Sequence, residues 1–219
     1  MRSFWSEPFL WIHLAGLAAV PICLEACCLF LAVGDPVSPG WMEMSLVAVV
    51  GIAPVFWMQW SRPFSIFSIL AVAMKPEQLT DEQRCLLSQF KTPGNKFIAG
   101  AAAVFMLGLL WFLYQTAPLV ASAAAFLPQW RLAGLLAAAL AFLAGNLFLQ
   151  VSLSVARVLF ISEAAFWATP PYPIERICQE FTIPGLQVNQ ILPAEISQAS
   201  AKMPPAELES AKREPASSD

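Results

Sequence analysis

Long apolar stretches separated by short polar links dominate the hydropathy pattern of the chain. The first runs from Pro8 to Val33 and exceeds the ~20 residues that a helix needs to cross a ~30 Å hydrocarbon core. Similar stretches follow at about 44–60, 97–117 and 132–155, and prolines and glycines mark most of their boundaries. The pattern predicts an all-α integral membrane protein with four transmembrane helices.

Residues 64–74 form a shorter apolar stretch between the second and third spans. At a rise of ~1.5 Å per residue they make only ~16 Å of helix, about half of the hydrocarbon thickness. We therefore expect a short helix that lies along the membrane interface or re-enters the bundle. The polar loop at 75–96 follows, and Thr80 and Gln83 form a capping-box pattern that predicts a short surface helix.

The chain is expected to divide into a membrane domain, residues 1–169, and a low-complexity tail, residues 170–219. The end of the tail consists mainly of Ala, Ser, Glu, Lys and Pro, which cannot bury enough apolar area to offset the entropy of ordering. The tail is therefore predicted to be acidic and disordered. The segment from Ile174 to Ile196 contains apolar residues, so docking of this segment on another surface is the alternative to disorder there.

Composition and charge exclude an ordinary soluble protein. Apolar residues make up 58% of the chain and charged residues 12%, about half of the ~25% usual in soluble domains. The net charge is −3. A chain with this charge is not expected to bind nucleic acid, whose partners carry basic patches. The lipid bilayer is its expected environment.

Basic residues gather in the segments that a four-span topology places on one side of the membrane. Of the 12 Lys and Arg residues, Arg131 alone lies on the other side. The positive-inside rule therefore predicts that both termini are cytoplasmic. Five tryptophans lie near the predicted span ends, as in an aromatic belt: Trp5, Trp41, Trp60, Trp130 and Trp167.

His13 is the only histidine, which excludes a metal site built from several imidazoles. Its depth in the first span matches that of Asn146 and Gln150 in the fourth. We expect a structural histidine that is hydrogen-bonded to another helix, because intramembrane polar groups commonly pair. The alternative is a ligand to chlorophyll or haem. No cofactor is expected unless the protein binds a pigment, chlorophyll or carotenoid.

Glu25 lies inside the first span, where a charged carboxylate costs ~2.5 kcal/mol or more. The same depth count places it near the outer interface, level with Tyr114 and Gln115. We expect a protonated carboxyl bonded to those groups, or one that reaches the outer surface. A proton relay is the alternative, although relays ordinarily use several ionisable groups in series.

The remaining patterns favour packing over catalysis. Cys23, Cys27 and Cys28 lack metal-ligand spacing and are expected to pack as small apolar residues. No Walker A, GxSxG, HExxH or GxGxxG motif is present, so no enzymatic activity is expected. A four-residue repeat of small side chains in the fourth span would let another helix approach closely: Ala137, Ala141 and Gly145.

Three short motifs lie at the ends of the first two spans and in the polar loop. They are SFWSEPFLWIH at 3–13 with LAG at 14–16, WMQW at 57–60 with RPF at 62–64, and KPE at 75–77 before LT at 79–80. Together they resemble a cyanobacterial family, the low-complexity tail membrane proteins, over residues 1 to about 175. The resemblance implies a multi-span protein of photosynthetic bacteria and brings no catalytic residue to this chain.

These observations favour a non-enzymatic accessory or assembly subunit of a larger membrane protein complex, in the thylakoid or plasma membrane. The expected contact surfaces are the small-residue face of the fourth span, residues 64–90 and residues 174–196. One alternative is a small transporter or channel that uses Glu25 and His13, although these lie ~18 Å apart along the helix. A pigment-binding membrane protein is the other.

Overall fold

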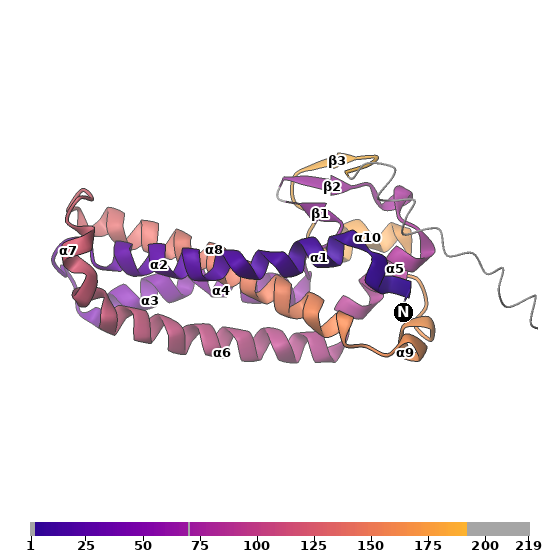
Figure 1. Ribbon diagram of the computed structural model, residues 1–219, viewed down its shortest axis with the longest axis horizontal. Coiled ribbons are helices and arrows are strands. Elements are labelled where there is room, and N and C mark those ends of the chain that lie inside the picture. Colours follow the sequence, from indigo (N-terminus) through magenta and orange to yellow (C-terminus); the bar gives the residue numbers. More distant parts are fainter. Residues whose placement is uncertain (1–2, 70, 192–219) are drawn as a thin grey trace, which may run out of the picture.

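Four long helical stretches form an up-down-up-down bundle (Figure 1). The computed structural model describes residues 3–69 and 71–191. Each stretch is long and apolar enough to cross a membrane, which confirms the predicted four-span membrane fold. The spans are Pro8–Leu31 (α1 Pro8–Ala15, 3-10 turn η2 Gly16–Ala18, α2 Ala19–Leu31), Gly40–Ser61 (α3 Gly40–Gly51, α4 Ala53–Ser61), Pro93–Ala124 (α6 Pro93–Thr116, η4 Ala117–Val120, α7 Ala121–Ala124) and Arg131–Leu159 (α8).

At one end of the bundle the remaining elements form a small structure that we call the head, residues 3–7, 62–92 and 160–191. Figure 1 shows the first described residues beside α5, α9 and α10 at this end, while α7 lies at the opposite end, here called the far end. The head contains η1 (Ser3–Ser6), β1 (Ser68–Ile69), β2 (Val72–Met74), η3 (Pro76–Gln78), α5 (Asp81–Phe90), α9 (Glu163–Trp167), α10 (Ile174–Glu180) and β3 (Leu186–Val188).

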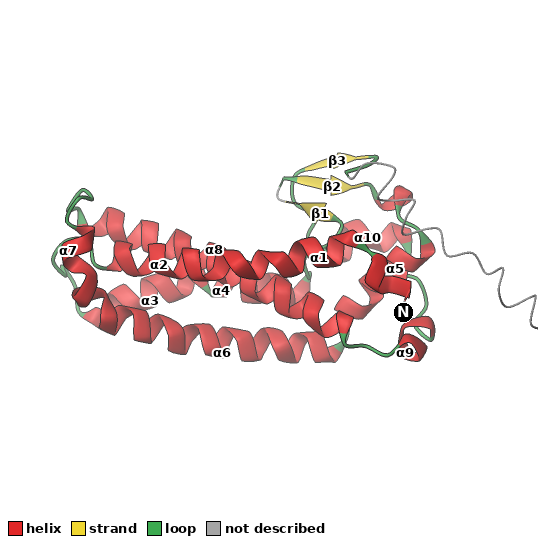
Figure 2. Cartoon of the chain, in the orientation of Figure 1, coloured by secondary structure: helices red, strands yellow, loops and turns green. Residues whose placement is uncertain are grey.

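The predicted helix at residues 64–74 is wrong: this segment supplies β1 and β2 (Figure 2). The two strands pair antiparallel, and β2 pairs in parallel with β3 from the C-terminal part of the chain. That distant partner satisfies the backbone groups that a helix would have satisfied locally. Gly185 precedes β3 with φ 80°, and a Cβ there would lie 1.8 Å from the carbonyl oxygen of Ala71. Only glycine permits this approach.

The beginning of the predicted disordered tail is an ordered part of the head. Ile177 is 1% exposed and Phe181 is 0% exposed, and both pack in a core with side chains of α1, α5 and α8. Arg62 Nη2 donates to the carbonyl oxygen of Cys178 at 2.8 Å. Docking on the head therefore overrides the low-complexity composition at residues 170–191. The predicted disorder of residues 192–219 falls outside the described residues.

The tryptophans predicted at span ends lie at the two ends of the bundle and are exposed. Trp41 begins the second span at the far end and is 67% exposed, whereas Trp60 lies near the head and is 45% exposed. Between these levels, Trp57 and Trp111 are also more than half exposed. The outer surface of the bundle thus carries the apolar side chains that a lipid environment requires.

Candidate functional site

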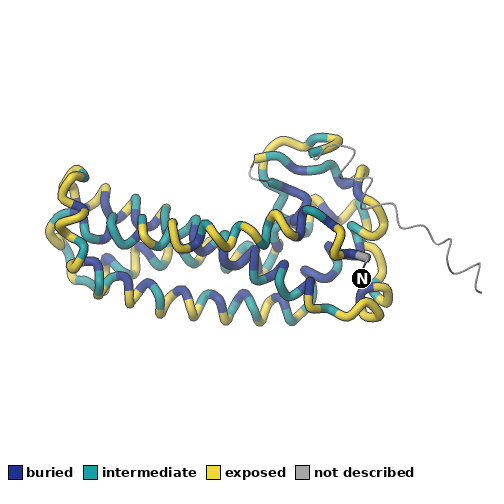
Figure 3. The backbone as a smooth tube through the Cα atoms, viewed as in Figure 1, coloured by how far each residue is buried: buried dark blue, intermediate teal, exposed yellow. Residues whose placement is uncertain are grey.

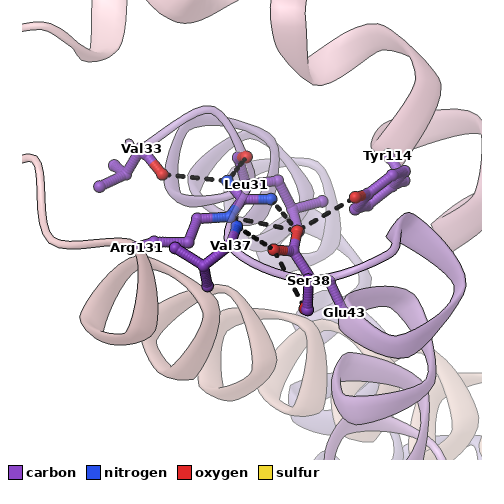
Figure 4. Close-up of polar contacts among 7 residues, drawn as sticks. All are labelled: Leu31, Val33, Val37, Ser38, Glu43, Tyr114 and Arg131. Carbon is purple, nitrogen blue, oxygen red and sulfur yellow. Dashed lines mark hydrogen bonds and ion pairs between the residues drawn. The ribbon is translucent and has the colours of Figure 1, made fainter. Parts of the chain in front are cut away.

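A buried pair of opposite charges lies at the far end of the bundle, formed by Glu43 and Arg131 (Figure 4). Glu43 lies in the first turn of α3, and Arg131 is the first residue of α8. The side chain of Glu43 is 0% exposed and that of Arg131 is 7% exposed. Arg131 Nε and Nη2 both donate to Glu43 Oε2, the former at 3.2 Å. The two residues form a buried ion pair between the second and fourth spans.

Neighbouring groups use the remaining hydrogen-bonding capacity of this pair. Arg131 Nη1 donates to the carbonyl oxygens of Leu31 at 2.7 Å and Val33 at 3.0 Å, at the end of α2. The backbone N–H of Val37 donates to Glu43 Oε1 at 3.3 Å. Tyr114 Oη, near the end of α6, donates to Glu43 Oε2 at 3.0 Å. The network therefore ties all four spans together and holds the loop between the first two.

The sequence pattern did not predict this ion pair. Of the two expectations for Glu25, the bond to Tyr114 is wrong, and the exposed position of Glu25 is compatible with the other, a carboxyl that reaches the outer surface. Glu25 is exposed on α2, Gln115 is exposed on α6, and Tyr114 bonds to Glu43 instead. Glu43 falls just before the apolar stretch of the second span, and Arg131 just before that of the fourth, so both resembled loop residues. The available signal was an acid and a base at the ends of two spans that the topology places on the same side.

Asn146 and Gln150 are fully buried on α8, next to the point where the second span is interrupted. Pro54 cannot donate a backbone hydrogen bond, and the span is interrupted between α3 and α4. Asn146 Nδ2 donates to the carbonyl oxygen of Gly51 at 2.9 Å, and Gln150 Nε2 donates to Asn146 Oδ1 at 3.0 Å. These two amides therefore stabilise the interrupted span. They were expected at the depth of His13, but their hydrogen bonds go to Gly51 and to each other.

The ring of His13 lies between two carbonyl oxygens at the border of the head, and its protonated nitrogen donates to one of them. Its Nδ1 lies 2.8 Å from the Phe9 oxygen, and its Nε2 lies 3.0 Å from the Ser68 oxygen in β1. The predicted level was nearly right, because Ser152 Oγ of α8 donates to the backbone oxygen of His13 at 2.8 Å. Neither ring nitrogen points away from the protein, so this arrangement does not present His13 as a ligand to chlorophyll or haem.

The small-residue face of the fourth span packs mainly inside the chain. Gly145 is buried, and a Cβ there would lie 3.1 Å from Cys23 Cβ of α2. Ala137 and Ala141 are half-buried. In α8, 16 of the 29 residues are buried, against 6 of the 24 in α6, and Figure 3 colours the chain by this burial. Close approach of α2 therefore explains this face, and Cys27 fills the bundle core from α2 at 0% exposure.

Glu7 joins the start of the first span to the predicted surface helix α5. Thr80 and Gln83 form the expected capping box, and Gln83 Nε2 also donates to Glu7 Oε2 at 3.2 Å. Glu7 is 7% exposed, and its burial raises the pKa of its carboxyl above the ordinary 4.5, with the Gln83 hydrogen bond acting in the opposite direction. The neutral form of Glu7 is thus favoured by folding.

This shift predicts a pH dependence of stability. The folded state binds the Glu7 proton more tightly than the unfolded state does. Protonated Glu7 therefore adds to the free energy of unfolding below pH 4.5, and this contribution is lost as the pH rises through the higher pKa of the folded state. Glu7→Gln should remove this contribution to the pH dependence. Unfolding free energies of both proteins in detergent, from about pH 4 to about pH 8, check the expectation. Parallel curves for the two proteins would contradict it.

The chemistry available at these positions is hydrogen bonding and charge pairing. Among residues 3–69 and 71–191, no group of three or more His, Cys, Asp or Glu side chains is placed to hold a metal ion. The buried polar side chains described above bond to one another or to backbone groups, while Gln150 Oε1 has no hydrogen-bond partner among the described residues. Fold and polar network together define a four-span integral membrane protein with a buried ion pair between its second and fourth spans.

Comparison with known families gives the next level of identification. The low-complexity tail membrane protein-like family matches residues 6–193, most of the chain. The chain therefore belongs to this family, as the three motifs indicated. Comparisons with curated proteins and with solved structures give no match.

Proposed function

We propose that this chain is a non-enzymatic accessory or assembly subunit of a larger membrane protein complex, with both termini on the cytoplasmic side. The proposed location is a thylakoid or plasma membrane of a photosynthetic bacterium, which the resemblance to the cyanobacterial family supports. The partner is another membrane protein that contacts the outward face of α6.

Two glycines on α6 carry this proposal. A Cβ added at Gly100 or at Gly108 would meet no atom within 4 Å, in contrast to Gly134 and Gly145 of α8, which α2 already contacts. Glycine inside a helix costs roughly 0.5–1 kcal/mol relative to alanine, and in membrane helices small residues allow a second helix to approach closely. Since no helix among the described residues contacts Gly100 and Gly108, we assign them to a helix of a partner.

Large apolar side chains flank these glycines on the same helix. Phe105 is 59% exposed and Phe112 is 61% exposed, on either side of Gly108. Aromatic rings beside a small-residue notch supply the van der Waals contact that drives helix association in lipid. This face of α6 is not one of the three surfaces expected from the sequence. Those surfaces are used largely within the chain, because α2 covers the fourth-span face, and side chains of residues 64–90 and 170–191 pack together in the core of the head.

The proposed orientation follows from the basic residues at the two ends. Arg131 is the only basic residue at the far end among the described residues, and its charge is paired with Glu43. An unpaired basic residue there would oppose the positive-inside rule, whereas a paired one adds little to the charge of the loop. The described basic residues at the head end are Arg62, Lys75, Arg84, Lys91, Lys96, Arg157 and Arg176.

Site-specific photo-crosslinking tests the partner surface. A benzophenone analogue of phenylalanine would replace Phe105 on α6, and in the matched control it would replace Leu140, which is 62% exposed on α8. Irradiation of native membranes should give an adduct with a different polypeptide from position 105 and little from position 140. Adducts with lipid or with a second copy of this chain at both positions would overturn the proposal.

A further inference from the structure

A groove of about 350 Å³ lies where the first and fourth spans meet the three-stranded sheet of the head. Ile12 and His13 form one wall and Phe148 and Val151 the other, while Ile69 and Pro184 contribute from the head. Phe64, Ile69 and Ala71 line the groove because Phe67 anchors this segment against Phe9 of α1 and β2 pairs with β3. In Figure 1 the sheet overhangs the side of the bundle at this level.

The lining of the groove offers almost nothing to a polar ligand. Among the described residues that line the groove, His13 alone carries a polar side chain, and its two ring nitrogens already lie within hydrogen-bond distance of the Phe9 and Ser68 oxygens. Apolar spaces of this kind stay free of water and accept hydrocarbon, because water would lose its hydrogen bonds there. The chemistry therefore selects an apolar occupant.

The position of the groove identifies the source of that occupant. Phe148 lies 11 residues before the end of α8, about 16 Å along the helix, within a span that is apolar enough to cross the membrane. Strands with open edges do not occur in the hydrocarbon region, so the sheet lies at the interface and covers the groove from the headgroup side. The molecules adjacent to such a groove are the lipids of one leaflet.

We propose that this groove binds one hydrocarbon chain of a membrane lipid, held between α1 and α8 beneath the sheet. Contacts with both walls and with the covering residues supply the dispersion energy that an unfilled space would lose. Gly16 allows Phe148 to pack closely against the first span at this wall, because a Cβ there would lie 3.2 Å from Cδ1 of Phe148. The site is independent of the proposed partner complex and would be present in the isolated chain.

Photolabelling of the full chain tests this site without any substitution. The probe is a phosphatidylcholine with a diazirine in one acyl chain, incorporated into vesicles that contain the protein. Peptide mapping should find labels at Ile69 and Pro184 well above those at Leu186, which belongs to the same sheet but is 76% exposed outside the groove. Equal labelling of the three residues, or labels confined to the outward faces of the spans, would overturn the proposal.

A pair of matched substitutions separates occupation of the groove from general contact with lipid. Ile12→Trp adds bulk inside the groove, whereas Ile22→Trp makes the same change at a residue that is 68% exposed elsewhere on the first span. Labelling at Ile69 and Pro184 should fall about tenfold in Ile12→Trp, as a loss of 1.4 kcal/mol in binding would produce. It should persist in Ile22→Trp, and an equal decrease or no decrease in both would contradict the site.

Discussion

Glu43→Gln should destabilise the chain by about 3 kcal/mol, near the lower end of the 3–5 kcal/mol typical when one partner of a buried ion pair is removed. Arg131 cannot lose its proton, so the variant leaves a permanent charge at a side chain that is 7% exposed. Two backbone oxygens, of Leu31 and Val33, would then be its main remaining partners. Unfolding free energy in mixed micelles of mild detergent and dodecyl sulfate measures this loss.

Glu25→Gln is the matched control for this substitution. It makes the same chemical change in a neighbouring span, but Glu25 is exposed on α2 and Tyr114 bonds to Glu43. Its unfolding free energy should fall much less than that of Glu43→Gln, because no buried charge loses its partner. In a double-mutant cycle, Arg131→Met should recover much of the stability lost in Glu43→Gln. Equal losses in Glu43→Gln and Glu25→Gln would contradict the proposed role of the ion pair.

Gly134→Leu should give the second large loss of stability, because it separates two packed spans. A Cβ at position 134 would lie 2.8 Å from Val33 Cβ and 2.9 Å from the backbone oxygen of Phe30. Backbone of α2 cannot yield as a side-chain tip can, and the complete leucine side chain adds to the overlap. Overpacking of this kind costs typically 1–3 kcal/mol, and thermal unfolding in detergent should show a clear decrease in Tm.

The comparison with Gly108→Leu distinguishes packing from helix propensity. Both substitutions replace a helical glycine in a span, but position 108 has open space where position 134 meets α2. Since leucine favours the helix over glycine by up to about 1 kcal/mol, Gly108→Leu should leave the isolated chain equally stable or more stable. A loss of stability in Gly108→Leu as large as that in Gly134→Leu would show that α6 packs differently from the structure described.

The parts of this fold that could be predicted are those that depend on nearby residues. A span is recognised from its own apolar length, and the capping box from Thr80 and Gln83, three residues apart. The sheet could not be predicted in this way, since β2 pairs with β3, which lies far along the chain beyond two further spans. An apolar stretch of β-branched and small residues is compatible with either structure until its partner is known.

The polar groups show the same limit. Depth counting along the helices placed His13 close to its true level, where Ser152 contacts its backbone oxygen, but depth does not specify which side chains face one another. Glu43 and Arg131 are 88 residues apart, and each resembled part of a loop. Their pairing depends on how the span ends meet at the far end of the bundle, which only the assembled fold determines.

Native electrophoresis after purification in a mild detergent tests the central claim most directly, with the wild type and Gly108→Leu compared side by side. We expect the wild type to migrate in an assembly with at least one other membrane protein, identified by mass spectrometry. The folded Gly108→Leu chain should migrate apart from that assembly, because leucine closes the notch on α6. Migration of the wild type only as a monomer or homo-oligomer would contradict the claim.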